Sequence, residues 1–302
     1  MKRDFLQLQG IDPQFLQALL DRTQELERAI VRGETHRRVL DGKSVVTLFY
    51  ENSTRTRCSF ETAAKFLGAQ VVNVSVVNSS VQKGETLEDT AVTLDRMRAD
   101  FIVVRHAMSG APAALARYVR ASVVNGGDGL HAHPTQALLD LATMQRHFGG
   151  VSGLTVAIIG DIKHSRVARS NLYGLQALGA RVKVYGPATM MPAGAERMGW
   201  HVCGSIEEAF VGSDVVMGLR IQTERQQCGL IPSAGEYNRF YGINQARMQL
   251  ANPGAIVMHP GPVNRGVEIS RDMFGDERLV KDEQVTFGVA ARMALFEALA
   301  QA

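Results

Sequence analysis

The stretch VVTLFYENSTRTRCSF, residues 45–60, contains a strand, a turn and the start of a helix. Its first six residues are almost all apolar, which is typical of a buried strand. Beyond the turn, the apolar residues recur at helical spacing, and they are Phe60, Ala63, Ala64 and Leu67. A strand, a turn and a helix in this order form the repeating unit of a parallel sheet, so the stretch predicts an α/β fold.

The turn in this stretch carries groups that bind anions. Ser53, Thr54 and Thr56 offer hydroxyl donors. Arg55 and Arg57 offer planar forks of N–H groups. Together with the unpaired N–H groups and the positive dipole at a helix start, these donors suit a phosphate dianion. The simpler alternative is a helix cap at Ser53 or Thr54 followed by two solvated arginines, and this stretch alone does not decide between them.

Strand-like and helix-like segments continue to alternate along the whole chain. Because 302 residues exceed what one hydrophobic core usually serves, we expect two domains. We predict an α/β protein with two doubly wound domains, each a mainly parallel sheet flanked by helices. The first is predicted to span residues 1–134, with a C-terminal helix at 286–302 packing back on it, and the second to span 135–285.

Polar side chains follow several of the predicted strands. Arg105 comes directly after the strand 101–104, and His133 follows the strand 122–125. Arg55 follows the strand described above. Since ligands of open parallel sheets bind beyond the carboxyl ends of the strands, we expect these three side chains to converge on one site.

Two segments are predicted to lack regular structure. The glycine-rich segment 126–129 is interpreted as a flexible turn. Residues 226–241 show no clear period of either helix or strand, which predicts a mobile loop. The chain contains no internal repeat and no low-complexity tract.

Composition and charge exclude several classes of function. With 45% hydrophobic and 21% charged residues, the chain has the composition of an ordinary soluble globular protein. A net charge of +3, spread evenly, is too small for a nucleic-acid surface. No apolar run approaches the ~20 residues that cross a bilayer, and residues 1–4 lead into no apolar signal core. We therefore expect a cytoplasmic protein that binds neither nucleic acid nor membrane.

Familiar cofactor and metal motifs are absent from the sequence. The turn at 160–163 is not a G-x-G-x-x-G turn, and no G-x-x-x-x-G-K-[ST] occurs. His131 and His133 are two residues apart but have no third metal ligand at a suitable spacing. The cysteines are too widely spaced for a disulfide framework or a thiolate metal site, and they are Cys58, Cys203 and Cys228. We expect neither a cofactor nor a metal.

Three motifs in order carry a resemblance to a known family. Ser53–Arg57, Arg105-His106 and His133-Pro134-Thr135-Gln136 together resemble the carbamoyl phosphate signature of the transcarbamylases. Within this superfamily the chain resembles the aspartate carbamoyltransferase catalytic chains over essentially its full length. The resemblance extends through Lys83-Gly84-Glu85-Thr86, Gly160-Asp161 with Arg166, Arg220–Arg225, and His259-Pro260-Gly261-Pro262. An ornithine-specific relative is expected to have a His-Cys-Leu-Pro segment at 259–262 and to lack a lysine such as Lys83.

The resemblance implies a role for each matching residue. The first domain would bind carbamoyl phosphate and the second L-aspartate, whose two carboxylates require at least two cations. Catalytic roles fall on Arg55, Thr56, Arg105 and His133. The carbamoyl phosphate ligands are the same four residues with Ser53, Thr54, Gln136, Gly261 and Pro262, the last two through backbone carbonyls. The aspartate ligands are Lys83, Arg166, Arg220 and Gln222.

The implied reaction is direct attack of the aspartate amine on the carbamoyl carbon, with no covalent intermediate, as an early step of pyrimidine (UMP) biosynthesis. The resemblance also implies a homotrimer in which Ser79 and Lys83 reach into a neighbour's site. A larger assembly with dihydroorotase or regulatory chains stays open. The alternatives are a transcarbamylase with a different amine acceptor, or a non-catalytic partner subunit of dihydroorotase.

Overall fold

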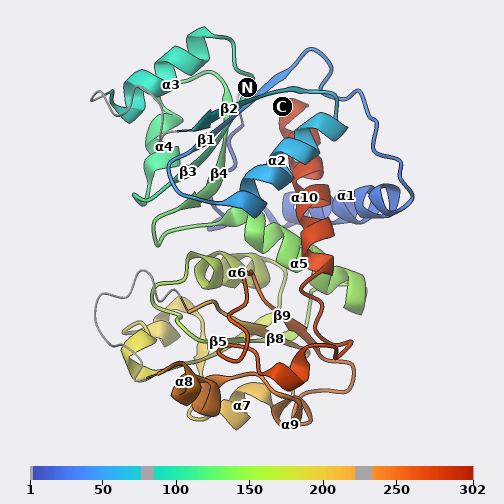
Figure 1. Cartoon of the computed structure of the whole chain (residues 1–302), viewed down its shortest axis with the longest axis vertical. Coiled ribbons are helices and arrows are strands. Elements are labelled where there is room, and N and C mark those ends of the chain that lie inside the picture. Colours follow the sequence, from blue (N-terminus) through green and yellow to red (C-terminus); the bar gives the residue numbers. More distant parts are fainter. Residues whose placement is uncertain (1–2, 76–84, 222–232, 302) are drawn as a thin grey trace. The chain divides into compact units, whose positions relative to one another are not determined.

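A computed structural model describes residues 3–75, 85–221 and 233–301 of the chain (Figure 1). The chain divides into two compact units, one made of Met1–Ala142 with Val285–Ala302 and the other of Thr143–Gln284. Ser79, Lys83, Gln222 and Cys228 lie outside the described residues. Within the described ranges, no helix is both long enough and apolar enough to cross a membrane.

The first unit is built on a four-stranded parallel sheet with the order β2-β1-β3-β4. Its strands are β1 (Ser44–Phe49), β2 (Gln70–Ser75), β3 (Phe101–His106) and β4 (Ser122–Asp128). Its helices are α1 (Pro13–Val31), α2 (Thr54–Phe66), α3 (Leu87–Arg96), α4 (Ala111–Leu115), α10 (Glu283–Ala300) and the first part of α5 (Pro134–Phe148). Each crossover between parallel strands runs through a helix, as this type of sheet requires.

Both faces of the first sheet are covered by helices. On one face, buried side chains of the strands, such as Leu48 and Val104, pack with Leu94 of α3 and Leu115 of α4. On the other face, the Phe296 ring of α10 meets Phe60 of α2 and Phe101 of β3 at centroid distances of 5.9 and 5.4 Å. Successive strand residues alternate between these two apolar layers, which is why the strands are almost continuously apolar.

The second unit holds a five-stranded parallel sheet with the order β7-β6-β5-β8-β9. Its strands are β5 (Thr155–Ile159), β6 (Arg181–Tyr185), β7 (His201–Val202), β8 (Val215–Gly218) and β9 (Ile256–Met258). Its helices include α6 (Arg166–Ala177), α7 (Ile206–Phe210), α8 (Ala234–Tyr241) and α9 (Gln245–Met248), with short 3-10 turns at Ala188–Met190, Ala195–Met198 and Arg271–Met273. The predicted fold class, with two parallel sheets flanked by helices, is confirmed.

Side-chain caps fix where several helices begin. The Asp12 carboxylate accepts a hydrogen bond from the Gln14 N–H, and Pro13 occupies the first helical position of α1. At α3, the Thr86 hydroxyl and the Asp89 carboxylate exchange hydrogen bonds with each other's backbone N–H groups. This reciprocal pair satisfies two N–H groups that a helix start would otherwise leave without a partner.

Two predictions of irregular structure are wrong. Gly126, Gly127 and Asp128 continue strand β4, where they are buried, instead of forming a flexible turn. The strand keeps its pairing through a bulge between Val104 and His106, and glycine repeats gave a turn signal where the chain instead stays extended. Of the loop predicted at 226–241, residues 226–232 lie outside the described residues, and the prediction is wrong from Ala234 on. There the chain forms α8, which buries only Tyr237 and so shows no apolar periodicity.

Candidate functional site

The carboxyl ends of three neighbouring strands meet at one edge of the first sheet. In the register of β1 and β3, Phe49 lies opposite Arg105, and the Tyr50 N–H donates to the Arg105 carbonyl at 2.8 Å. In the register of β3 and β4, His106 lies opposite Asp128. The segments that carry Ser53–Arg57, Arg105 and 131–136 therefore leave adjacent strands at the same edge, as the sequence predicts.

The start of α2 departs from an ordinary capped helix. Ser53 occupies the capping position with an extended backbone, but its side chain makes no capping hydrogen bond. Thr56 is buried in the first turn, while Thr54 and Arg55 are exposed. The hydroxyl of Ser53 therefore does not serve the role that the simpler alternative gives it, which favours the anion-binding interpretation.

Arg105 is held in place from two directions. Its Nη1 donates to the carbonyl of Gly126 at 3.2 Å, and its Nε lies 3.2 Å from Oε2 of Glu51. Both side chains are only 12% exposed, so solvent screens this ion pair much less than a surface pair. Glu51 is not among the predicted site residues, although an acidic side chain two positions before the hydroxyl-rich turn indicates a partner for a nearby arginine.

His133 and Gln136 lie at the start of α5, and both are buried. The Gln136 Nε2 donates to Oδ1 of Asp140 at 2.9 Å, one helical turn further along. This bond fixes the orientation of the Gln136 amide, because an ionised Asp140 carboxylate only accepts hydrogen bonds and therefore faces the NH2 group.

Beneath this helix start lies a fully buried arginine of α10, which the sequence did not single out. Arg292 donates to the carbonyl of Gly288 at 2.6 Å and lies 3.5 Å from the Thr135 hydroxyl. Its guanidinium also covers the Phe60 ring at 4.7 Å. Burial lowers the pKa of Arg292 to about 9, and the charge of Asp140 opposes this shift. Arg292 therefore supports the start of α5 through the Thr135 hydroxyl, in a place from which solvent is excluded.

The carboxyl edge of the second sheet carries the other predicted residues. β5, β8 and β9 are neighbours, and the Leu219 N–H donates to the carbonyl of Ile159 at 2.8 Å. Arg166 is the first residue of α6, after β5, and is only 6% exposed. Arg220 follows β8, and a cis peptide bond joins Gly261 to Pro262 after β9.

A buried carboxylate joins two of these strand-end loops. Glu268 is 2% exposed and accepts hydrogen bonds from the Ile221 N–H at 2.7 Å and from the Asn264 N–H at 2.9 Å. Burial raises its pKa, and these hydrogen bonds act in the opposite direction. Glu268 thus ties the segment just after Arg220 to the loop after β9, a link that the sequence did not reveal.

Some of the predicted site residues are not placed by these observations. Lys83 and Gln222 lie outside the described residues, and the remaining carbamoyl phosphate and aspartate ligands belong to two different units. Their assignment to one site stays a prediction.

Both ring nitrogens of His131 have hydrogen-bonding partners, Asp128 Oδ2 at 3.0 Å and Gln7 Oε1 at 3.1 Å. His131 therefore has a structural role.

Comparisons with known proteins cover nearly the whole chain. Residues 3–146 match the model of the aspartate/ornithine carbamoyltransferase carbamoyl-P binding domain, and residues 152–299 match that of the Asp/Orn binding domain. The aspartate carbamoyltransferase catalytic subunit of Caldanaerobacter subterraneus subsp. tengcongensis is 53% identical, covering 100% of this chain and 99% of that protein. The corresponding subunit of Gluconacetobacter diazotrophicus is 54% identical, with 99% and 94% covered.

A solved structure agrees with these sequence matches. The aspartate transcarbamoylase of Trypanosoma cruzi in complex with carbamoyl phosphate and aspartate superimposes with a TM-score of 0.89 at 32% identity. The alignment covers 98% of this chain and 96% of that chain.

Proposed function

This chain belongs to the aspartate/ornithine carbamoyltransferase family, and we propose that it transfers the carbamoyl group of carbamoyl phosphate to the amine of L-aspartate. The products are N-carbamoyl-L-aspartate and phosphate, and the reaction is an early step of pyrimidine (UMP) biosynthesis. The observation that carries this proposal is the donor-rich edge of the first sheet. There, the segments that contain Arg55, Arg105 and His133 lie at the carboxyl ends of three neighbouring strands. The aspartate-specific relatives, which match over the full chain, support the choice of acceptor.

The first unit would bind and activate carbamoyl phosphate. Ser53, Thr54, Arg55 and Thr56 would hold the phosphate through hydroxyl, guanidinium and backbone N–H donors at the start of α2. Gln136 would orient the carbamoyl NH2 together with the backbone carbonyls of Gly261 and Pro262. With the phosphate and the NH2 group held by these contacts, the carbonyl carbon would stay accessible to the attacking amine.

The chemical step requires stabilisation of two developing charges. As the amine nitrogen adds to the carbamoyl carbon, negative charge develops on the carbonyl oxygen, and then on the phosphate as its C–O bond breaks. Thr56, Arg105 and His133 would donate to the carbonyl oxygen, and the fixed position of Arg105 costs little reorganisation at that moment. Holding the two substrates together contributes further, since a bimolecular reaction becomes unimolecular.

The second unit would bind L-aspartate. Arg166 and Arg220 follow β5 and β8, and each would hold one carboxylate, with Gln222 and Lys83 assisting. A guanidinium matches a carboxylate through two parallel hydrogen bonds, which a lysine cannot provide. A pocket for ornithine would instead need an anion to pair with the second ammonium of that substrate. The two cations Arg166 and Arg220 therefore disfavour ornithine binding.

Replacing Arg166 by alanine is expected to raise the KM for aspartate roughly 10- to 150-fold, which corresponds to one charge-assisted contact of about 1.5–3 kcal/mol. The KM for carbamoyl phosphate should change little. The measurement is steady-state kinetics with aspartate and with ornithine, and the native chain should use aspartate alone. The exposed Arg197 of the same unit provides the control Arg197→Ala. Turnover of ornithine by the native chain would contradict the proposal that aspartate is the acceptor. An unchanged KM for aspartate in the Arg166→Ala chain would show that Arg166 does not bind aspartate.

Replacing Asp140 by asparagine is expected to destabilise the first unit by roughly 1–3 kcal/mol, because the buried Arg292 charge loses the favourable field of a buried carboxylate. The Gln136 amide can still donate to the asparagine oxygen, so the variant isolates the charge. Denaturant unfolding measures the free energy, and the double variant Asp140→Asn/Arg292→Met should recover much of it. A loss below about 1 kcal/mol would show that the charge pair does not matter for stability.

The assembly and the cellular location are also proposals. We propose a homotrimer, in which Ser79 and Lys83 would complete a neighbour's site. The relatives are named catalytic subunits, which supports an assembly of more than one chain. A cytoplasmic location is supported by two thiols that form no disulfide, the exposed Cys58 and the buried Cys203. The intact set of polar residues argues against a non-catalytic partner of dihydroorotase, because a scaffold needs none of them.

A further inference from the structure

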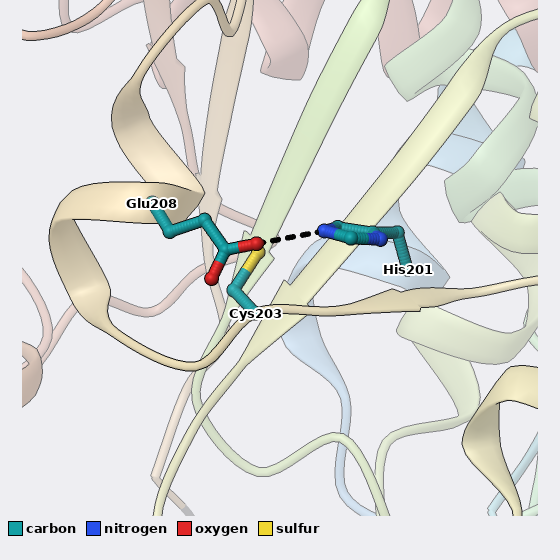
Figure 2. A group of neighbouring side chains, drawn as sticks. All are labelled: His201, Cys203 and Glu208. Atoms are coloured by element: carbon teal, nitrogen blue, oxygen red, sulfur yellow. Dashed lines mark hydrogen bonds and ion pairs between the residues drawn. The ribbon is translucent and has the colours of Figure 1, made fainter.

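A histidine, a cysteine and a glutamate meet at one edge of the second sheet, in the group shown in Figure 2. His201 lies on the edge strand β7, Cys203 follows two residues later, and Glu208 belongs to α7. One ligand atom from each residue lies within 4.8 Å of the others. In the order β7-β6-β5-β8-β9, this group is two strands away from β5 and belongs to none of the substrate ligands.

Hydrogen bonds hold each member of the group, two of them to the backbone. The Cys203 N–H donates to the carbonyl of Val184 at 3.0 Å, which fixes the cysteine against β6. The Gly204 N–H donates to Oε2 of Glu208 at 2.6 Å, and the other oxygen of this carboxylate lies 2.9 Å from the His201 Nε2 (Figure 2). Because one carboxylate oxygen is bound to the backbone, the other is presented toward the imidazole and the thiol.

The group differs from an ordinary surface ion pair in its third member. His201 and Glu208 are exposed, which gives an ion an entry path, while the Cys203 side chain belongs to the hydrophobic core and is 5% exposed. The neighbouring cation, Lys183, donates to the carbonyls of Glu208 and Val211 at 3.2 and 2.7 Å. Those carbonyls at the end of α7 partly offset the charge of its ammonium.

We propose that His201, Cys203 and Glu208 bind one divalent cation of the zinc class, with water in the fourth position. A nitrogen, a sulfur and an oxygen ligand suit Zn²⁺, whereas Mg²⁺ and Ca²⁺ prefer oxygen ligands alone. Ligand atoms around a tetrahedral Zn²⁺ lie roughly 3.3–3.8 Å apart, which small side-chain rotations from the present arrangement can reach. Two metal bonds would replace the hydrogen bond between His201 and Glu208.

Binding would change the protonation of the group in a defined way. Burial raises the pKa of the Cys203 thiol to about 11, and the charge of Glu208 adds to this shift, so the thiol carries its proton at neutral pH. The sulfur–metal bond forms as the S–H bond breaks, and the proton passes to the solvent. The ion would connect the edge strand β7 to α7 and stabilise this corner of the second unit.

The test uses the full chain with Cys58→Ser and Cys228→Ser, which removes the other thiols. After treatment with a chelator, the chain is titrated with Co²⁺ and then with Zn²⁺. We expect one Co²⁺ per chain, with the visible bands of a tetrahedral ion and a thiolate-to-cobalt charge-transfer band, and displacement by Zn²⁺. Mg²⁺ should not compete. These readouts do not depend on carbamoyl transfer, so they can fail while the proposed function stands.

Two variants assign the ligands. His201→Ala changes an exposed residue and should weaken Zn²⁺ binding at least tenfold while the chain stays folded. Cys203→Ser should abolish the charge-transfer band, with thermal unfolding as a check on folding. The matched control is His147→Ala, because His147 and Glu283 form a similar pair at 2.9 Å in the same unit. Absence of the charge-transfer band in the parent chain, or equal Zn²⁺ affinity in the parent and His201→Ala chains, would overturn the proposal.

Discussion

Arg55→Ala is expected to lower kcat for carbamoyl transfer by roughly 100- to 1,000-fold, and Arg105→Ala by at least as much. Arg55 would contribute its donors to the phosphate at the start of α2, where charge increases as the C–O bond breaks. Arg105 would contact the carbonyl oxygen, and it is already held by the Gly126 carbonyl and by Glu51. Removing either guanidinium takes away a positioned donor that bulk water cannot replace. Steady-state and single-turnover kinetics measure the effect.

The two substitutions differ in what they do to stability. Arg55 is exposed, so its removal should leave the free energy of unfolding nearly unchanged. Arg105→Ala takes a charged partner from Glu51 in a mostly buried place, so denaturant unfolding must accompany the kinetics. Lys65→Ala is the control, because Lys65 is an exposed cation in the last turn of the same helix. Near-native kcat in the folded Arg55→Ala or Arg105→Ala chain would remove that residue from the proposed site.

Sequence alone could predict the fold because parallel sheets have a clear pattern. Strands buried on both faces are short apolar runs, and each is followed by a turn and an amphipathic helix. The rule that ligands bind at carboxyl ends then located Arg55, Arg105 and His133 at one edge before the strand order was known. The actual order β2-β1-β3-β4 makes those three strand ends neighbours, which the sequence did not state.

Arg292 and Glu268 could not be predicted as neighbours of these segments, because they are distant in sequence from the residues that they contact. Arg292 is near Thr135 only because α10 returns to the first unit, and no spacing rule connects residues so far apart. Glu268 joins two loops in the same way. The group at 201–208 is different, because its ligands are close in sequence. The spacing between the three cysteines gives no metal signal, whereas His201 stands two residues before Cys203 and Glu208 five residues after it.

If neighbouring chains of the proposed trimer share each site, two inactive variants should regain activity when they are mixed. A site that is complete within one chain would give no such recovery. If each site takes Arg55 from one chain and Lys83 from its neighbour, then chains with Arg55→Ala and chains with Lys83→Ala are each inactive alone. In a ring assembled from an equal mixture, an intact site forms wherever an Arg55-containing chain precedes a Lys83-containing one in the required order. Random mixing therefore restores about one quarter of the native activity per site, as expected for a closed ring of head-to-tail contacts.

A second mixture separates complementation from any general benefit of reassembly. Arg55 follows β1, and Arg105 lies on the neighbouring strand β3 of the same sheet. Both residues of one chain would therefore belong to the same site. Mixing Arg55→Ala with Arg105→Ala chains then leaves every site without one arginine, and no activity should return. Each mixture is unfolded, refolded together and assayed after the trimer fraction is isolated by size. If the Arg55→Ala and Lys83→Ala mixture stays as inactive as its parents, each site must be complete within one chain.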